Sequence, residues 1–437
     1  MNFKKIKNFL AFAKQNGIDT GLSSLCYFST SPMVLGHHFF IKKFIKNNYS
    51  LKYYFYFLKQ IFSIYNAYNF TIINNNKFYN QKKIYITWGF KKDFDKSGNI
   101  KDQYFKIRSK NNNILWIVLY LDKKLPFKIA KNIILISQIN SGNKFKSLLS
   151  IFYIFKIFID KKFNFKKIVH QLSYPSALAE NIFKKISNLI NHNSIEKIFT
   201  PYEGQPFQHY IPNQFKKTNN KIKIYGYVSH TLPHSFDMFN RIGSPDILFL
   251  HSNDQKKYFN KNLGWEKKKL KVINSLRLKK TRQKNLNNKI YFSNQLFNLN
   301  NLSKNFEKYL KNSKNGSIPK LSINIHPRGY SPSKQYELKV KFEKIIRNNI
   351  NKFNYNSKKN ISFVVGLTST PIYLLAHKIK VIHIVNNKFF ESYSNKFWPS
   401  IKSKEIGRNI YEYSIKRNNK ILNLKKKSNL LIRSIAK

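Results

Sequence analysis

Short apolar runs that alternate with segments of helical periodicity constrain the fold of this chain more than any other feature. The clearest unit begins with the apolar run 246–250, which is followed by Ser252 and Gln255 at the spacing of a helix capping box. The helix predicted there ends near Gly264, and residues 270–273 form the next apolar run. A strand, a helix and a strand in this order predict a parallel sheet covered by helices.

The same rhythm recurs along the chain and predicts an α/β fold. Further runs typical of strands are residues 197–200, 221–229, 289–292, 321–325, 361–365 and 381–385. Stretches with helical spacing are 176–190, 302–310, 342–350 and 371–377. In the first 190 residues, the runs 53–58, 83–88 and 114–121 fit either strands or buried helix segments.

A polar, basic stretch at residues 278–288 interrupts this rhythm and is typical of a linker. We therefore predict two facing Rossmann-like α/β domains with parallel sheets and a cleft between them. The first comprises residues 1–280 and the second residues 287–437, with the chain crossing near residue 283. Residues 388–437 are expected to form a basic tail with helical stretches.

The charge of the chain leaves two interpretations open. Its 80 Lys and Arg against 19 Asp and Glu give a formal charge of +61, which is typical of proteins that bind nucleic acid or anionic membranes. However, the lysines are spread from Lys4 to Lys437 and accompany many Asn, Ile, Phe and Tyr, as expected from an A/T-rich genome. No helix-turn-helix, zinc finger or RNA-binding motif is present.

Several features favour a cytoplasmic protein. Cys26 is the single cysteine, so neither an internal disulfide nor a zinc site built from several cysteines can form. The longest apolar run, 148–159, is interrupted by Lys156 and is too short to span a membrane. Residues 1–14 lack a signal-peptide cleavage site and have an apolar helical face. That face could either contact the core or lie on the inner membrane surface.

Three short motifs each follow a predicted strand, where open α/β sheets place their ligands. The first is the segment from Thr200 to Pro206, in which Glu203 follows a strand and precedes Gly204. A carboxylate on a loop shaped by glycine and proline suits a general base, and Glu203 is our candidate. An ordinary surface glutamate in a turn is the alternative. Tyr202 and Gln205 flank this position as candidates for contacting an acceptor.

The second motif is His326-Pro327, which ends what we take to be the middle strand of the second half. A histidine there could bind a nucleotide phosphate and stabilise its departure, and Arg328 could clamp the phosphate. A histidine bonded only to backbone at a strand end fits equally well.

The third motif runs from Thr368 through Ser369 and Thr370 to Pro371. Thr370 is expected to cap a helix that begins at Pro371, so that its hydroxyls and free N–H groups could bind phosphate. A plain capped turn is the simpler alternative. His230 and His234, which follow another predicted strand, are further candidates for lining the cleft.

The order of an acidic residue with Gly, then His-Pro, then paired Ser/Thr resembles bacterial sialyltransferases and capsule polysialyltransferases. The same order resembles the broader set of surface-polysaccharide glycosyltransferases of the two-domain GT-B architecture, and residues 202–277 resemble O-antigen and other surface-carbohydrate transferases. Together these resemblances cover residues 195–385. The resemblance implies that Glu203 is the base, that His326 binds the nucleotide phosphate, and that Ser369 and Thr370 hold phosphate. It also implies an acceptor-side first domain and a second domain that binds the nucleotide-sugar.

The resemblance implies a nucleotide-sugar donor, with CMP-linked sugars favoured, and a surface glycan or lipid-linked acceptor. Tyr202 stands where the family usually has a first acidic residue, which leaves the identity of the base open. No Asp-x-Asp motif lies in a suitable loop, so we expect metal-independent transfer and no cofactor. A basic nucleic-acid-binding protein and an inactive transferase relative remain alternatives, as does peripheral contact with an anionic membrane.

Overall fold

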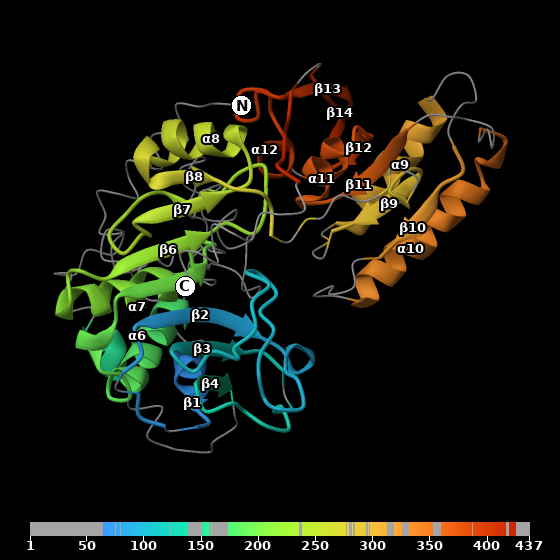
Figure 1. Ribbon diagram of the computed structural model, residues 1–437. Helices are drawn as coiled ribbons and strands as arrows, with labels where there is room; N and C mark the ends of the chain where they lie inside the picture. The colour runs from blue at the N-terminus through green and yellow to red at the C-terminus, as the bar shows by residue number, and fades with distance from the viewer. Residues whose placement is uncertain are drawn as a thin grey trace.

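The computed structural model describes residues 64–424 of the chain with internal gaps. The gaps are residues 75, 79, 123, 139–150, 157–158, 160–173, 236–237, 277, 279–281, 283–284, 294–295, 297, 313–318, 326–331, 353–359, 387 and 417–418. The runs 1–14 and 53–58 lie outside the described residues. Two mixed but mainly parallel sheets occupy separate halves of the molecule (Figure 1).

The first sheet has eight strands in the order β1-β4-β3-β2-β5-β6-β7-β8. All neighbours are parallel except β1, which is antiparallel to β4. The strands are β1 (Phe70–Ile72), β2 (Lys83–Gly89), β3 (Ile114–Tyr120), β4 (Ile133–Gln138), β5 (Lys197–Pro201), β6 (Lys223–Tyr227), β7 (Ile247–Leu250) and β8 (Leu270–Val272).

The continuous apolar runs in this sheet arise because both of its faces are covered. Every residue of β3 is buried. Leu115, Ile117 and Leu119 belong to one hydrophobic cluster, whereas Trp116 and Val118 belong to the cluster on the other face. A strand buried on both faces reads as one apolar run, which explains why the sequence alone could not separate it from a buried helix.

Helices cover the first sheet on the side of Leu115. They are α6 (Tyr174–Ser187) and α7 (Pro206–Thr218), which contribute Ile182, Ile186, Ile211 and Phe215 to that cluster. The helix α8 (Asn253–Leu263) joins β7 to β8. As predicted, Ser252 caps α8 by accepting the Gln255 N–H at 3.1 Å, and Gly264 ends it in the left-handed region with φ of 72°.

The second sheet has six strands in the order β10-β9-β11-β12-β14-β13. The first four strands are parallel, and β14 and β13 are antiparallel to their neighbours. The strands are β9 (Lys289–Phe292), β10 (Ser322–Asn324), β11 (Ile361–Val365), β12 (Lys380–Ile384), β13 (Ile401–Gly407) and β14 (Ile410–Ile415). The helices are α9 (Leu299–Asn312), α10 (Pro332–Arg347), α11 (Thr370–Ala376) and α12 (Lys388–Glu391).

The α/β prediction with two parallel-dominated sheets is therefore confirmed, but three details of it are wrong. Residues 388–437 were expected to form a basic tail with helical stretches; α12 lies there, but residues 401–415 form an antiparallel hairpin that extends the second sheet. The strand before His326 is β10, which lies at the sheet edge rather than in its middle. The helix predicted at 342–350 is α10, which begins at Pro332 and ends at Arg347. The domain limits 1–280 and 287–437 stay a prediction.

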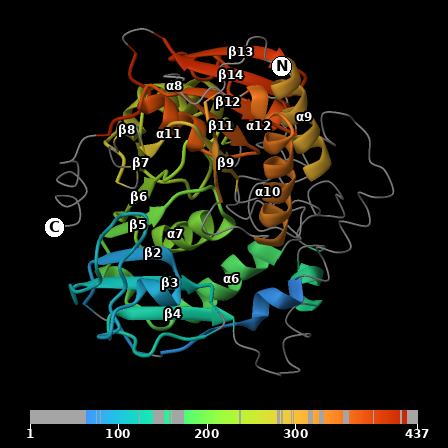
Figure 2. The ribbon, with the colours of Figure 1, turned by 90° about the vertical axis from the view of Figure 1, so that its right-hand side faces the viewer.

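The two halves, which Figure 2 shows one above the other, share a hydrophobic cluster. From the first half it contains Val228, Leu248 and Tyr258, and from the second it contains Ile372 and Trp398 among others. We call this contact the joint. Polar bonds accompany it: the buried Asp254 of α8 accepts the backbone N–H of Ser400 at 2.9 Å and its hydroxyl at 3.0 Å. The joint therefore fixes how the two sheets face each other.

A buried carboxylate holds the connection between β2 and β3. Asp102 is completely buried and accepts the Thr87 hydroxyl at 2.5 Å, the Tyr104 N–H at 2.8 Å and the Phe105 N–H. Burial raises the pKa of Asp102 to about 6, and these hydrogen bonds only partly offset that effect. The ionised side chain is therefore retained at neutral pH at a cost to stability.

We expect Asp102 to make the free energy of unfolding fall as the pH rises from about 4 to about 6.5. Because its pKa is higher in the folded state than in the unfolded state, the folded protein binds more protons in this window. The loss amounts to about 3 kcal/mol for a shift from 3.8 to about 6. Urea unfolding at several pH values should show this slope in the wild type and lack it in Asp102→Asn. Asp95→Asn, in an exposed turn, is the control and should keep the wild-type slope.

Candidate active site at the carboxyl edges of the two sheets

Each sheet has a point where its strand order reverses. In the first sheet this point lies between β2 and β5, because successive strands run outward from β2 to β4 on one side and from β5 to β8 on the other. In the second sheet it lies between β9 and β11. Ligands of open α/β sheets bind outside the carboxyl ends of the strands at such points. A ligand site is therefore expected at the loops after β5 and β11.

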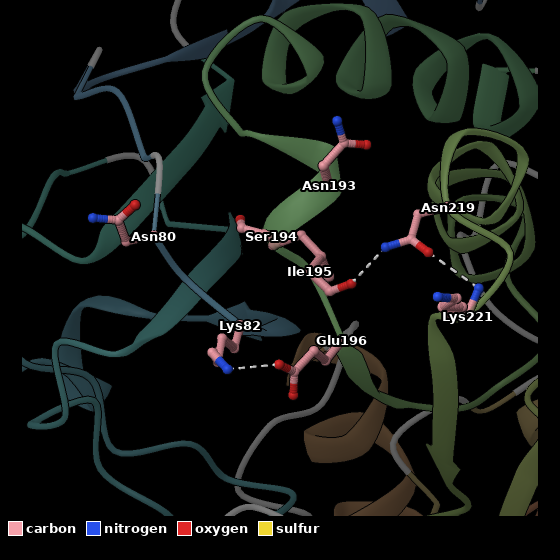
Figure 3. Close-up of a pocket in the computed structure, with 8 residues that line it drawn as sticks. All are labelled: Asn80, Lys82, Asn193, Ser194, Ile195, Glu196, Asn219 and Lys221. Carbon is pink, nitrogen blue, oxygen red and sulfur yellow. Dashed lines mark hydrogen bonds and ion pairs between the residues drawn. The ribbon is translucent and has the colours of Figure 1, made fainter.

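A shallow surface pocket of about 580 Å³ lies at the opposite edge of the first sheet (Figure 3). It is adjacent to the starts of β2 and β5, and Lys82 and Glu196 form an exposed ion pair of 2.8 Å in it. Its lining residues are Asn80, Lys82, Asn193, Ser194, Ile195, Glu196, Asn219 and Lys221. Because its position is at the amino edge, this pocket contains none of the residues that the sequence motifs singled out.

The loop after β5 carries Glu203 and is held in a defined shape. Gly204 adopts a φ of 75°, which disfavours a side chain. The buried Gln208 accepts the backbone N–H groups of Glu203 at 2.8 Å and Gln205 at 3.1 Å, and its amide donates to the Pro201 carbonyl. The side chain of Gln208 thus ties the end of β5 to the start of α7. Glu203 itself is half-buried.

Tyr202 was a candidate for contacting the acceptor, but it lies in the interior. Its side chain is completely buried, and its hydroxyl is 3.4 Å from His209 Nε2 and 3.3 Å from Ser244 Oγ. Its ring meets that of Trp265 edge-on at 5.9 Å. Tyr202 therefore supports the loop from beneath. Gln205 is half-buried at the N-cap of α7.

A buried arginine connects this support to the loop. Arg241 donates from Nε to His209 Nε2 at 3.0 Å and from Nη2 to the Gly204 carbonyl at 2.8 Å. Burial and the nearby Arg241 charge hold the pKa of His209 well below its usual range, so His209 is neutral and its Nε2 accepts. Gly243 has no room for a side chain, since a Cβ there would lie 2.3 Å from the His209 carbonyl oxygen.

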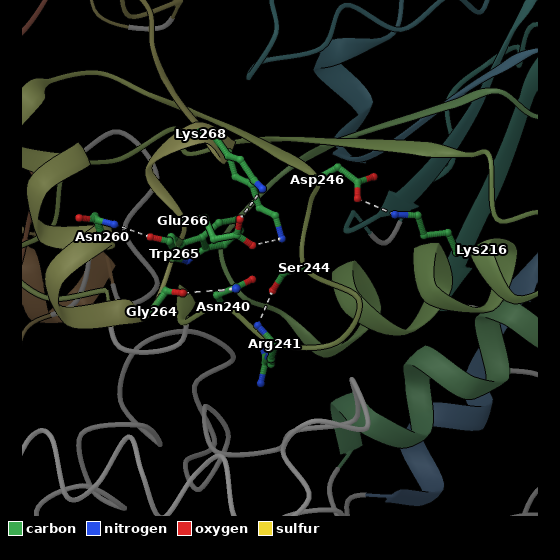
Figure 4. Close-up of polar contacts among 11 residues, drawn as sticks. Lys216, Asn240, Arg241, Ser244, Asp246, Asn260, Gly264, Trp265, Glu266 and Lys268 are labelled. Carbon is green, nitrogen blue, oxygen red and sulfur yellow. Dashed lines mark hydrogen bonds and ion pairs between the residues drawn. The ribbon is translucent and has the colours of Figure 1, made fainter.

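We expect Arg241→Met to lower the free energy of unfolding by about 2–4 kcal/mol. The substitution keeps the length of the side chain but leaves the Gly204 carbonyl and His209 Nε2 buried without their donor. Lys268→Met is the control, because Lys268 forms an exposed ion pair with Glu266 nearby (Figure 4) and its loss should cost less than about 0.5 kcal/mol. Urea unfolding midpoints measure both. Equal costs would contradict a structural role for Arg241.

The loop after β11 gathers the three hydroxyl residues of the third motif. Thr368 Oγ1 lies 2.9 Å from Thr370 Oγ1 and accepts the Thr370 N–H at 3.3 Å. Helix α11 begins at Thr370 with Ser369 as the N-cap, whereas we predicted Thr370 as the cap and Pro371 as the first residue. Thr370 is thus the first helical residue, one earlier than predicted, and Pro371 lies in the first turn, where its missing N–H needs no partner.

The loops after β6 and β11 meet at the joint. The backbone N–H of Thr231 donates to the Ser369 hydroxyl oxygen at 3.0 Å. The hydroxyl of Tyr393 lies 2.8 Å from the Thr231 carbonyl oxygen and 2.9 Å from that of Thr368. The carboxyl edges of the two sheets are thereby brought together. Since β6 is the neighbour of β5, the Glu203 loop lies one strand away from this contact.

The two histidines after β6 differ in their contacts. His230 is half-buried, and its carbonyl accepts the Gln255 amide of the first half at 2.9 Å. His234 is buried, and its ring meets that of Phe397 in the second half edge-on at 5.0 Å. That these histidines line a ligand cleft stays a prediction.

His326 and Arg328 lie outside the described residues. The described strand that precedes them, β10, ends at Asn324. Because β9 separates β10 from β11, the end of β10 is two strand spacings, roughly 10 Å, from the end of β11. Convergence of His326 with Ser369 and Thr370 stays a prediction.

Sequence reasoning missed Gln208, Arg241 and Tyr393. Gln208 has a local signal, since a glutamine three residues after the N-cap is half of a capping box. Arg241 and Tyr393 have none, because their partners Gly204 and Thr231 are distant in the sequence.

No helix in the described part of the chain is long and apolar enough to cross a membrane. Nor do the described ranges contain a group of three or more His, Cys, Asp or Glu placed to hold a metal ion.

Comparisons with known proteins give little further information. No protein-family model matches the chain, and no curated protein matches it. Among solved structures, one from a study of enzymatic glycosyl transfer with retention by trehalose-6-phosphate synthase is similar over 62% of this chain and 78% of that chain. The sequence identity is 13% and the TM-score is 0.31, which is too low to bear on fold or function.

Proposed function

We propose that this protein is a glycosyltransferase that moves a sugar from a nucleotide-sugar donor to a surface glycan or a lipid-linked acceptor. The observation that supports it most is the contact between the two carboxyl edges, where Thr231 of the first half bonds to Ser369 of the second. A transferase has to hold two substrates against each other, and two sheets that meet by their ligand-binding edges suit this task.

In this proposal Glu203 takes the proton from the acceptor hydroxyl. It follows β5 at the point where the strand order of the first sheet reverses, and its loop is fixed by Gln208 and Arg241. A base on a fixed loop needs little reorganisation when the acceptor arrives. His230 on the neighbouring strand is the second candidate for this role.

The donor nucleotide lies on the second half, and CMP-linked sugars are favoured by the family resemblance. The hydroxyls of Thr368 and Thr370 share one hydrogen bond, and the hydroxyl that accepts in it would donate its own proton to a phosphate oxygen. The Ser369 oxygen accepts from Thr231, which leaves its own proton available to a phosphate as well. His326 and Arg328 would offset the charge that builds on the leaving phosphate, so that transfer needs no metal ion.

We expect Glu203→Gln to lower sugar transfer by about 10²–10⁴-fold while leaving nucleotide binding nearly intact, because it removes basicity but keeps shape and hydrogen bonding. Glu196→Gln is the matched control, since Glu196 precedes the same strand at the amino edge and forms only an exposed ion pair. Transfer assays with purified donor and acceptor measure both variants. Wild-type transfer by Glu203→Gln would move the role of base to His230 or His234.

A thermal-shift screen with CMP, CDP, UDP, GDP and their sugars tests the nucleotide site itself. A nucleotide present at a hundredfold excess over its Kd should raise the free energy of unfolding by about 2.7 kcal/mol. Thr368→Val should weaken this shift, whereas Thr218→Val, in an exposed position at the end of α7, should not.

The same screen distinguishes the alternatives. Saturable stabilisation by a single-stranded oligonucleotide, with none by any nucleotide, would favour a nucleic-acid-binding protein. Stabilisation by a nucleotide together with no transfer to any acceptor would favour an inactive relative of the transferases.

A further inference from the structure

The loop that follows β3 exposes three apolar side chains. Leu121 is 49% exposed, Leu125 38% and Phe127 99%. Figure 1 shows this loop, together with the loop that follows β2, beyond the carboxyl ends of the two strands. A single exposed apolar residue is ordinary, whereas three in one short loop, one of them wholly in solvent, mark a place where the molecule meets another surface. We call these three residues the apolar tip.

The backbone beneath the apolar tip is held in place by the loop that follows β2. The Asp122 carboxylate accepts the backbone N–H of Lys91 at 2.6 Å, and the Ala130 N–H donates to the Gly98 carbonyl at 3.0 Å. A Cβ at Gly98 would lie 2.8 Å from backbone atoms of the second loop, so the two loops pack closely there. Phe127 therefore extends into solvent from a supported backbone.

The exposed charge on these two loops is mostly positive. Of their acids, Asp93 and Asp102 are buried, whereas the exposed Asp95 accepts two backbone N–H groups of its own turn at 3.0 Å each. The exposed lysines of the two loops are Lys91, Lys92, Lys96, Lys101, Lys124, Lys128 and Lys131. Within the described residues none of these seven forms an ion pair. Their charge is therefore available to an anionic partner of the apolar tip.

We propose that the apolar tip inserts into the surface of an anionic lipid bilayer, with the lysines of the two loops at the level of the headgroups. A phenylalanine that protrudes wholly into solvent needs a matching hollow in a protein partner, whereas the bilayer interface accepts it anywhere. The unpaired lysines select anionic lipid over neutral lipid through Coulomb attraction.

The position of the apolar tip also suits a lipid-linked acceptor. The strands β3, β2 and β5 are parallel neighbours, so the tip lies at the same edge of the first sheet as Glu203. The inference nevertheless does not depend on the proposed glycosyl transfer, because lipid binding requires neither donor nor acceptor.

The test is co-sedimentation of the full chain with vesicles of phosphatidylcholine alone or mixed with phosphatidylglycerol. We expect stronger binding to the mixed vesicles, and this binding should weaken as salt is raised. Phe127→Ser should lower the partition coefficient for the mixed vesicles by about tenfold, because it removes the burial of an aromatic side chain in lipid. Since Phe127 is 99% exposed, the variant should melt at the wild-type temperature.

A charge variant tests the second half of the proposal. Replacing Lys124 and Lys128 together by glutamine should lower the partition coefficient for the mixed vesicles by about 30-fold and leave binding to the neutral vesicles unchanged.

Phe152→Ser is the matched control. Phe152 is 65% exposed on the helical residues 151–156, outside the two loops, so it tests whether any exposed phenylalanine of this basic chain would do. It should bind like the wild type. A loss in Phe152→Ser that equals the loss in Phe127→Ser, or binding that does not depend on phosphatidylglycerol, would overturn the proposal. So would a wild type that binds no vesicle at low salt, or self-association that Phe127→Ser abolishes, since these point to a protein partner or a second copy.

Discussion

The joint is the constraint on which the rest of the structure depends. Parallel sheets bring their loops to one edge, but each sheet alone has only half of a two-substrate site. The shared cluster around Tyr258, Ile372 and Trp398 turns these two edges toward each other. The bonds from Tyr393 and Asp254 then set their register, since buried polar groups must keep their partners. Displacing the halves would cost both the apolar contact and these bonds.

Buried side chains of the first half hold the loop that carries Glu203 in place. The loop that carries Glu203 rests on Tyr202, His209 and Arg241, all of them buried. A buried arginine is costly unless its donors are used, and here they bind one backbone carbonyl and one neutral imidazole. Tyr202 and Glu203, both predicted from the sequence to lie at the acceptor site, therefore differ. Tyr202 is buried beneath the loop, whereas Glu203 is half-buried.

The sequence predicts the strands of this fold better than its helices and edges. Runs such as 361–365 are short, apolar and placed between segments of helical spacing, so this alternation identifies them as strands. Helix α7 was not predicted, because Pro206 and Pro212 resemble loop signals, although the first lies in the opening turn. The hairpin of β13 and β14 was taken for a basic tail, because β13 places Lys402, Lys404 and Glu405 at the sheet edge. Charged edge strands carry little apolar pattern.

The sequence predicts which loops carry the candidate site residues, but not whether these loops meet. A motif at a strand end can be read locally, and the loops of Glu203 and of Thr368 to Thr370 indeed follow β5 and β11. Whether two such loops meet depends on contacts across the chain, such as the one between Thr231 and Ser369, which are 138 residues apart. No local pattern contains that information.

The chain has only 19 Asp and Glu, so a carboxylate in a loop could be taken for a functional group because acids are rare. The structure does not support that inference. Among the described residues, five acids are buried, namely Asp93, Asp102, Glu180, Asp254 and Glu391. Asp93, Asp102, Asp254 and Glu391 accept backbone N–H groups, and Glu180 binds lysines. A rare carboxylate in this protein is thus commonly a structural acceptor, so rarity alone does not mark Glu203 as a base. The proposal for Glu203 therefore rests on its position, because Glu203 follows the strand at which the order of the first sheet reverses and lies half-buried at the carboxyl edge.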